Sequence, residues 1–103
     1  TALAILAGIG DRSDAEKMLE GKQIAASLST KAYVYDALLS VGGYGKYIIE
    51  DICRVYGKML DHGATSVWET EKGADDFGGA GSLCHGWSSV ACYVFDKYLN
   101  NNA

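Results

Sequence analysis

The amino-acid sequence predicts an all-α fold built of helical hairpins. The chain has no proline, and it lacks the sustained alternation of Val, Ile or Thr that marks half-buried strands. The apolar residues between positions 44 and 60 recur at the spacing of one helix face. These residues are Ile48, Ile49, Ile52, Val55, Tyr56, Met59 and Leu60. Glycines separate the apolar stretches, so we expect helices that alternate with short turns.

The first element expected is an apolar helix over residues 2–8. Its residues are apolar on almost every side, as in a helix that is buried among several neighbours. Gly8 and Gly10 are expected to end it. The chain begins at Thr1 rather than at Met, and the first and last helices need neighbours that the chain does not contain. We therefore expect the native N-terminus to lie upstream.

A second helix is expected to begin at Ser13. Ser13 and Glu16 have the spacing of a capping box, in which both side chains accept hydrogen bonds from free amides at the helix start. This helix should continue through Met18 and Leu19 and resume over residues 24–28.

Two longer helices should follow and form a hairpin. The first is expected over residues 31–41, and Gly42–Gly43 is its stop signal. Its apolar side should contain Tyr33, Val34, Ala37, Leu38 and Val41. The second runs from Tyr44 to about Leu60, carries the periodic apolar residues given above, and is closed by His62–Gly63.

The last quarter of the chain should contain a polar loop and a final helix. Residues 71–81 are rich in glycine and charge and predict a flexible loop. Ser82 is the expected N-cap of a helix that reaches about Leu99. The apolar side of that helix should include Leu83, Trp87, Val90, Ala91, Val94 and Tyr98. Trp87 is therefore interpreted as a core residue.

Composition narrows the possible functions. With 103 residues, one domain or part of one is expected. The net charge of −4 argues against a nucleic-acid partner, because phosphate-binding domains are usually basic. The longest apolar run is too short to span a bilayer, so no membrane partner is expected. Three cysteines without disulfide spacing predict buried free thiols and leave the compartment undecided.

Two short segments contain the residues best suited to chemistry. In Ala64–Thr70, Trp68 stands directly before Glu69, and in Ser82–Trp87 the imidazole of His85 lies at the expected helix start. An aromatic face can stack on a sugar ring, a carboxylate can transfer a proton, and a neutral imidazole can both donate and accept a hydrogen bond. The combination points to carbohydrate chemistry.

These segments resemble a known family. Met59-Leu60-Asp61-His62-Gly63-Ala64-Thr65-Ser66-Val67-Trp68-Glu69 resembles the "ML-x-x-GATT-x-WE" segment of α-L-rhamnosidases and related six-hairpin glycosidases. Ser82-Leu83-Cys84-His85-Gly86-Trp87-Ser88 resembles their "S-L-C/N-H-x-W/Y-S/G" segment, one loop later. The resemblance covers nearly the whole chain but is specific only over 59–69 and 82–88.

The resemblance implies an (α/α)6 toroid, in which residues 1–103 form the C-terminal fragment of the catalytic domain. It also implies inverting hydrolysis of terminal α-L-rhamnosyl groups without a cofactor or an obligatory metal. Glu69 matches the general base, His85 a ligand of a sugar hydroxyl, and Trp68 a ring-packing position. Two features depart from the family: Ser66 replaces a Thr, and Asp75–Asp76 has no counterpart. No residue matches the general acid, so the isolated chain is expected to be inactive.

Other interpretations remain open. The same helical scaffold could serve as a non-catalytic carbohydrate-binding or interaction module. It could also be a neutral fragment that is held together by self-association. The expected partners are thus a rhamnosylated glycan or glycoside, together with the remainder of the catalytic domain or a second copy of the chain. A metal site on Cys84, His85 and Cys92 fits no common zinc spacing.

Overall fold

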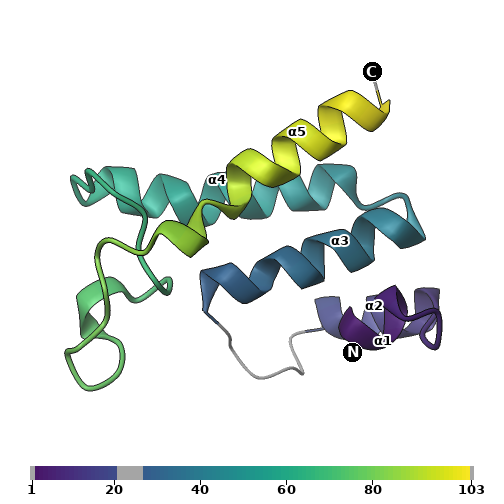
Figure 1. The fold of residues 1–103 in the computed structure, drawn as a ribbon, viewed down its shortest axis with the longest axis horizontal. Helices are drawn as coiled ribbons and strands as arrows, with labels where there is room; N and C mark the ends of the chain where they lie inside the picture. Colours follow the sequence, from purple (N-terminus) through teal and green to yellow (C-terminus); the bar gives the residue numbers. More distant parts are fainter. Residues whose placement is uncertain (1, 21–26, 103) are drawn as a thin grey trace.

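The computed structural model describes residues 2–20 and 27–102, and side chains through residue 98. Within these ranges the chain is helical and contains no strand, which confirms the all-α class (Figure 1). The helices are α1 (Ala2–Leu6), α2 (Arg12–Leu19), α3 (Lys31–Val41), α4 (Gly45–Asp61) and α5 (Val90–Asn102). Short 3-10 turns are η1 (Leu28–Thr30), η2 (Gly73–Asp75) and η3 (Gly86–Ser88). Among the described helices, none is long and apolar enough to cross a membrane.

Helix α3 lies at the centre of the molecule. It forms an antiparallel hairpin with α4, and it also contacts α1, α2 and α5 (Figure 1). The turn of the hairpin consists of Gly42 and Gly43, whose φ angles are +89° and +86°. Residues with a Cβ rarely adopt this conformation, so the two glycines both stop α3 and reverse the chain.

The main core surrounds α3 and brings together buried side chains from every described α-helix. Its buried members are Ile5, Ala15, Met18, Tyr35, Ala37, Leu38, Ile48, Ile52, Val90 and Val94. A smaller cluster contains Leu28, Val55 and Met59, and Trp68 packs against it. This second cluster lies under the long connection between α4 and α5, and it holds that connection against the helices.

The hairpin helices agree closely with the sequence-based expectation. Helix α3 has the predicted bounds, and α4 buries four of the predicted apolar residues: Ile48, Ile52, Val55 and Met59. The expected apolar side was too wide, however, since Tyr33 is 51% exposed and Leu60 is 72% exposed. Leu60 follows Met59 directly and is therefore rotated about 100° away from the buried face.

The helix predicted over residues 2–8 is shorter and less buried than expected. Helix α1 ends at Leu6, and only Ile5 among its described side chains is buried, while Leu3 is 63% exposed. The helix packs against α3 and, less extensively, against α2, and these two neighbours leave Leu3 in contact with solvent. Gly8 ends the apolar stretch as predicted, with a φ of +80°.

The capping box of α2 uses different residues from those predicted. Asp11 is the N-cap, and its Oδ1 accepts hydrogen bonds from the amides of Ser13 (2.9 Å) and Asp14 (3.3 Å). Asp14 Oδ2 in turn accepts from the Asp11 amide at 3.0 Å. The helix starts two residues earlier than the Ser13 cap predicted, which puts Ser13 inside its first turn. The helix continues through Leu19 as expected; of the predicted resumption at 24–28, residues 24–26 lie outside the described residues.

The last helix differs most from the prediction. Helix α5 begins at Val90 rather than after Ser82, although Val90 and Val94 are buried as expected. Trp87, interpreted as core, is 81% exposed. The reason is that the main chain of Ser82 and His85 bonds to the segment that follows α4, and this pairing goes with an extended backbone at His85.

The cysteines are free thiols as predicted, but the prediction that they are buried is wrong. Cys53, Cys84 and Cys92 are all exposed free thiols. Cys53 directly follows buried Ile52 on α4, so the helical rotation of about 100° turns it away from the core.

Candidate functional site

The two sequence segments singled out for chemistry lie side by side in the connection between α4 and α5. The Glu69 amide donates to the Ser82 carbonyl and the His85 amide to the Val67 carbonyl, both at 2.9 Å. The Ser66 hydroxyl donates to the Leu83 carbonyl at 2.5 Å. These bonds pair the two segments in antiparallel directions, although they are separated by the loop that contains η2.

Glu69 is half-buried at this junction. Its carbonyl accepts a hydrogen bond from the Leu28 amide at 2.8 Å, which ties it to the start of η1. Its carboxylate Oε2 accepts a longer bond, 3.4 Å, from the Ser82 amide. The side chain is thus held by the second segment and is still partly open to water. A carboxylate in this situation can accept a proton from a water molecule.

Trp68 has two roles in the local structure. One face of its ring lies against Gly73, where an added Cβ would come within 2.9 Å of the Trp68 Cε3 atom. The ring also meets the edge of the His62 ring, with 6.0 Å between the ring centroids. Trp68 lines a surface groove of about 460 Å³ together with residues such as Lys58, Lys72 and Leu83. It therefore anchors the loop while part of its ring remains available to a ligand.

His85 is the N-cap residue of the short η3 turn, not a residue in the first turn of α5. Its backbone is extended, and its ring stands perpendicular to that of Trp87, with centroids 5.8 Å apart. The predicted cap, Ser82, bonds instead to the main chain of Cys84, with distances of 3.1 and 3.3 Å. The structure thus brings the segments of Glu69 and His85 together. The ring of Trp68 faces Gly73 and His62, whereas that of His85 faces Trp87.

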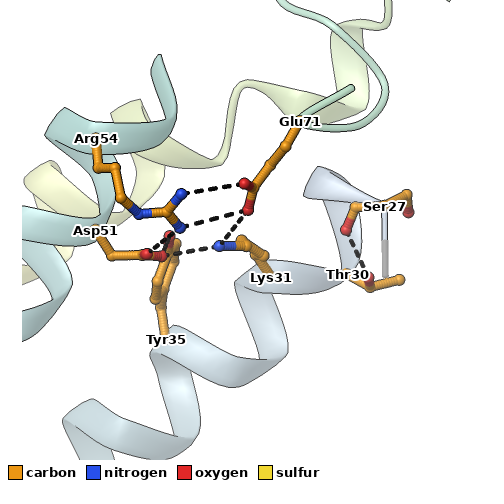
Figure 2. A network of polar contacts seen from close by, with 7 residues as sticks. All are labelled: Ser27, Thr30, Lys31, Tyr35, Asp51, Arg54 and Glu71. Carbon is orange, nitrogen blue, oxygen red and sulfur yellow. Dashed lines mark hydrogen bonds and ion pairs between the residues drawn. The ribbon is translucent and has the colours of Figure 1, made fainter. Parts of the chain in front are cut away.

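A polar network beside the site was not anticipated from the sequence (Figure 2). Asp51 is buried, and its carboxylate accepts hydrogen bonds from Tyr35 Oη at 2.6 Å, Lys31 Nζ at 2.9 Å and Arg54 Nη2 at 2.7 Å. Lys31 and Arg54 also pair with Glu71, at 3.2 and 3.1 Å. The sequence carried one signal of this arrangement, because Asp51 lies one helical turn from Ile48 and Val55 on the buried face of α4.

The network keeps both carboxyl groups ionised. Burial alone would raise the pKa of Asp51, but hydrogen bonds from Tyr35, Lys31 and Arg54 outweigh it and hold the pKa below its usual value. Burial likewise opposes ionisation of Glu71, and its pKa is lowered by the Arg54 and Lys31 contacts. Burial and the bond to Asp51 raise the pKa of Tyr35. The two carboxylates and two cations balance in charge.

The position of Glu71 makes this network relevant to the site. Glu71 follows Glu69 by two residues and is bound to α3 through Lys31 and to α4 through Arg54. Between them, Thr70 is buried. The chain that carries Glu69 is therefore fixed on one side by the second segment and on the other by the ion pairs, as Figure 2 shows for Glu71.

In the described part of the chain, no group of three or more His, Cys, Asp or Glu residues has the geometry to hold a metal ion. No protein-family model matches the chain, and neither a curated protein nor a solved structure matches it significantly.

Proposed function

We propose that this chain is part of a glycoside hydrolase that resembles α-L-rhamnosidases and removes terminal α-L-rhamnosyl groups with inversion of configuration. Glu69 is the general base that takes a proton from the attacking water. His85 binds a sugar hydroxyl, and Trp68 packs against the sugar ring. The remainder of the catalytic domain contributes the general acid and the other hairpins of an (α/α)6 toroid.

The observation that supports this proposal best is the pairing of the two segments that resemble the family. Twelve residues separate Glu69 from Ser82 along the chain, yet main-chain bonds hold the segments together and the Glu69 carboxylate accepts from Ser82. A general base must be held in position and must still reach water. Half-burial of Glu69 meets both requirements.

Inversion also requires space opposite Glu69. In inverting glycosidases the two carboxyl groups lie roughly 6.5–9.5 Å apart, so that a water fits between the base and the anomeric carbon. The partly open side of Glu69 is where this water would stand. The α3–α4 hairpin, with its apolar stripe and glycine turn, is the kind of unit from which such a toroid is built.

The direct test uses a protein in which this segment is joined to the preceding hairpins of the catalytic domain. Glu69→Ala should lower kcat for p-nitrophenyl α-L-rhamnoside by at least about 100-fold, which is the smaller end of the usual contribution of a positioned base. Glu50→Ala is the matched control, because Glu50 is an exposed carboxylate on α4 whose side chain is 67% accessible. It should retain full activity.

Chemical rescue separates loss of the base from loss of the fold. Azide needs no proton acceptor, so it should restore cleavage by Glu69→Ala and yield a rhamnosyl azide of inverted configuration. Near-normal hydrolysis by Glu69→Ala would remove Glu69 from the mechanism. Retention of configuration by the unaltered protein would exclude inversion.

A second candidate is a carbohydrate-binding module without hydrolytic activity. The exposure of Trp87 next to Tyr33 and Tyr93 favours it, because the three exposed rings line one groove and contiguous exposed apolar surface marks binding sites. The two candidates differ in one result. A protein that binds rhamnosides but does not cleave them, even with the preceding hairpins present, is a binding module.

A further inference from the structure

A groove at the C-terminal end of α4, where the connection to α5 begins (Figure 1), combines basic side chains with an aromatic ring. It has a volume of about 460 Å³, within the range of small-ligand sites. Lys58 and His62 come from the end of α4, and Lys72 precedes the η2 turn. Trp68 and Leu83 supply apolar surface from the two paired segments. The groove thus offers positive charge beside a ring face.

The two lysines of the groove carry charges that no ion pair neutralises. Within residues 2–20 and 27–98, neither Lys58 nor Lys72 forms an ion pair, whereas Lys31 and Lys97 do. Asp76 interacts with Lys72 only at longer range. Both groove lysines are exposed, so their ammonium groups can turn toward a ligand without breaking an ion pair. The groove therefore favours a ligand with negative charge.

The balance of charge in the groove favours a monoanion. Besides the two lysines, one carboxylate, that of Asp75, lines the groove, which leaves one excess positive charge before His62 is counted. His62 Nδ1 lies 2.8 Å from the Lys58 carbonyl and donates to it, so only Nε2 is free for a ligand. The groove also lies at the last turn of α4, where the partial negative charge of the helix end disfavours a dianion. A carboxylate therefore suits the groove better than a phosphate does.

The apolar part of the groove suits a flat ring. Trp68 is half-buried, and its ring is held by Gly73 on one face and by the His62 ring at its edge. A ligand that packs on Trp68 thus meets a preorganised surface, which reduces the entropic cost of binding. Leu83 is 47% exposed and adds apolar surface. The described residues that line the groove include no serine, threonine, asparagine or glutamine, so an aromatic ring, which has no hydroxyls to satisfy, fits better than a sugar.

We infer that the groove of Lys58, Trp68 and Lys72 binds an aromatic monocarboxylate. The ring of this ligand packs on Trp68, and its carboxylate accepts hydrogen bonds from the two lysines. The inference goes beyond the proposed function and does not rest on it, because neither Glu69 nor His85 lines the groove. Trp68 belongs to both proposals, so in the hydrolase an aromatic carboxylate would compete with the sugar ring.

Titrations of the isotope-labelled chain, followed by NMR, test the inference. Three probes share one ring and differ in charge: benzamide is neutral, benzoate is a monoanion, and phenyl phosphate is largely a dianion at neutral pH. Benzoate should bind with a dissociation constant of about 1 mM, as expected for so small a ligand. Benzamide should bind about fivefold more weakly, because it lacks the two ion pairs. Of the two tryptophans, Trp68 should show the shifted indole signal, and Trp87, which lines a different groove, should not.

Substitution of the lysines isolates the contribution of charge. Lys58→Gln and Lys72→Gln should each weaken benzoate binding about twofold, and the double variant about fivefold, while benzamide binding stays unchanged. Lys46→Gln is the matched control, because Lys46 is a lysine of α4 outside the groove whose side chain is 89% accessible. It should leave both affinities unchanged. Leu83→Ala should weaken benzoate and benzamide by the same factor, because it removes apolar surface only. Circular dichroism verifies that each variant is folded.

The inference is overturned if benzoate binds no more tightly than benzamide, or if the double variant binds benzoate as well as the unaltered chain does. Tighter binding of phenyl phosphate than of benzoate would refute the assignment to a monoanion. Tighter binding of D-glucuronate, an acidic sugar, would refute the assignment to an aromatic ring. None of these results depends on Glu69, so the proposed hydrolase function is tested separately.

Discussion

Replacing Asp51 with alanine tests whether the buried polar network holds the connection between α4 and α5 in place. Asp51 is 9% exposed and accepts from Tyr35, Lys31 and Arg54 at 2.6–2.9 Å. The substitution leaves the buried Tyr35 hydroxyl without its acceptor. It also removes the negative charge that Lys31 and Arg54 share with Glu71.

The expected loss is about 3 kcal/mol in the free energy of unfolding. Breaking a buried charge pair costs about 3–5 kcal/mol, but the side chains of Lys31 and Arg54 are 21% and 59% exposed, so water solvates part of the freed charge. The stranded Tyr35 hydroxyl adds about 1–3 kcal/mol. For a domain of this size, a loss of 3 kcal/mol lowers Tm by about 12–24 °C.

Urea denaturation followed by circular dichroism measures this loss. Asp51→Asn keeps the shape of the side chain and an acceptor oxygen for Tyr35, and should cost less, about 1–2 kcal/mol. Glu50→Ala changes an exposed carboxylate on the same helix and should stay within about 0.5 kcal/mol of the unaltered chain. The reasoning is refuted if Asp51→Ala is as stable as Glu50→Ala.

Two further predictions follow from the same region. The pKa values of Asp51 and Glu71 are lowered in the folded chain, so the ionised carboxylates stabilise the fold. This contribution is complete at a pH above the usual carboxyl pKa of about 4, and it is lost as the pH falls through the lowered pKa values. Between pH 7 and pH 3, urea titrations should therefore show a larger fall in the free energy of unfolding for the unaltered chain than for Asp51→Asn. An equal fall in both proteins would contradict this prediction. Gly73→Ala should cost about 1–3 kcal/mol, because residue 73 has a φ of +60° and its new Cβ would meet the Trp68 ring at 2.9 Å. Gly63→Ala is the control, because residue 63 has a φ of +76° and no atom within 4 Å of the new Cβ. It should lower the stability measured by thermal unfolding less than Gly73→Ala does. Equal losses would show that the Trp68 ring moves aside without cost and would contradict the prediction.

The sequence was most informative where structure is local. Helices α3 and α4 are each long enough for the 3.6-residue period to stand out, and Gly42–Gly43 marks their turn without ambiguity. Adjacent helix positions are harder to separate, as Leu60 shows: it is as apolar as buried Met59 but 72% exposed. Periodicity identifies the centre of a buried face better than its edges, because the edges depend on where neighbouring elements end.

At the candidate site, too, the local features could be predicted from the sequence and the tertiary contacts could not. The residue types that could act on a sugar, Glu69, Trp68 and His85, are visible in the sequence because two short motifs contain them. The pairing of these motifs is not visible, because it consists of main-chain bonds across the η2 loop. The same pairing explains why the expected helix start at Ser82 was wrong: the Ser82 carbonyl accepts from the Glu69 amide, and the His85 backbone is extended instead of helical.

The sequence by itself therefore determined the helical class, the central hairpin and the residue types at the candidate site. Their chemical basis is local, in the form of backbone preferences, apolar spacing and glycine stops. Only the tertiary structure decided that Trp87 is exposed beside His85 and that Asp51 joins two helices to Glu71. These two arrangements depend on how segments far apart in the chain pack together. That packing cannot be predicted from the pattern of adjacent residues in the sequence.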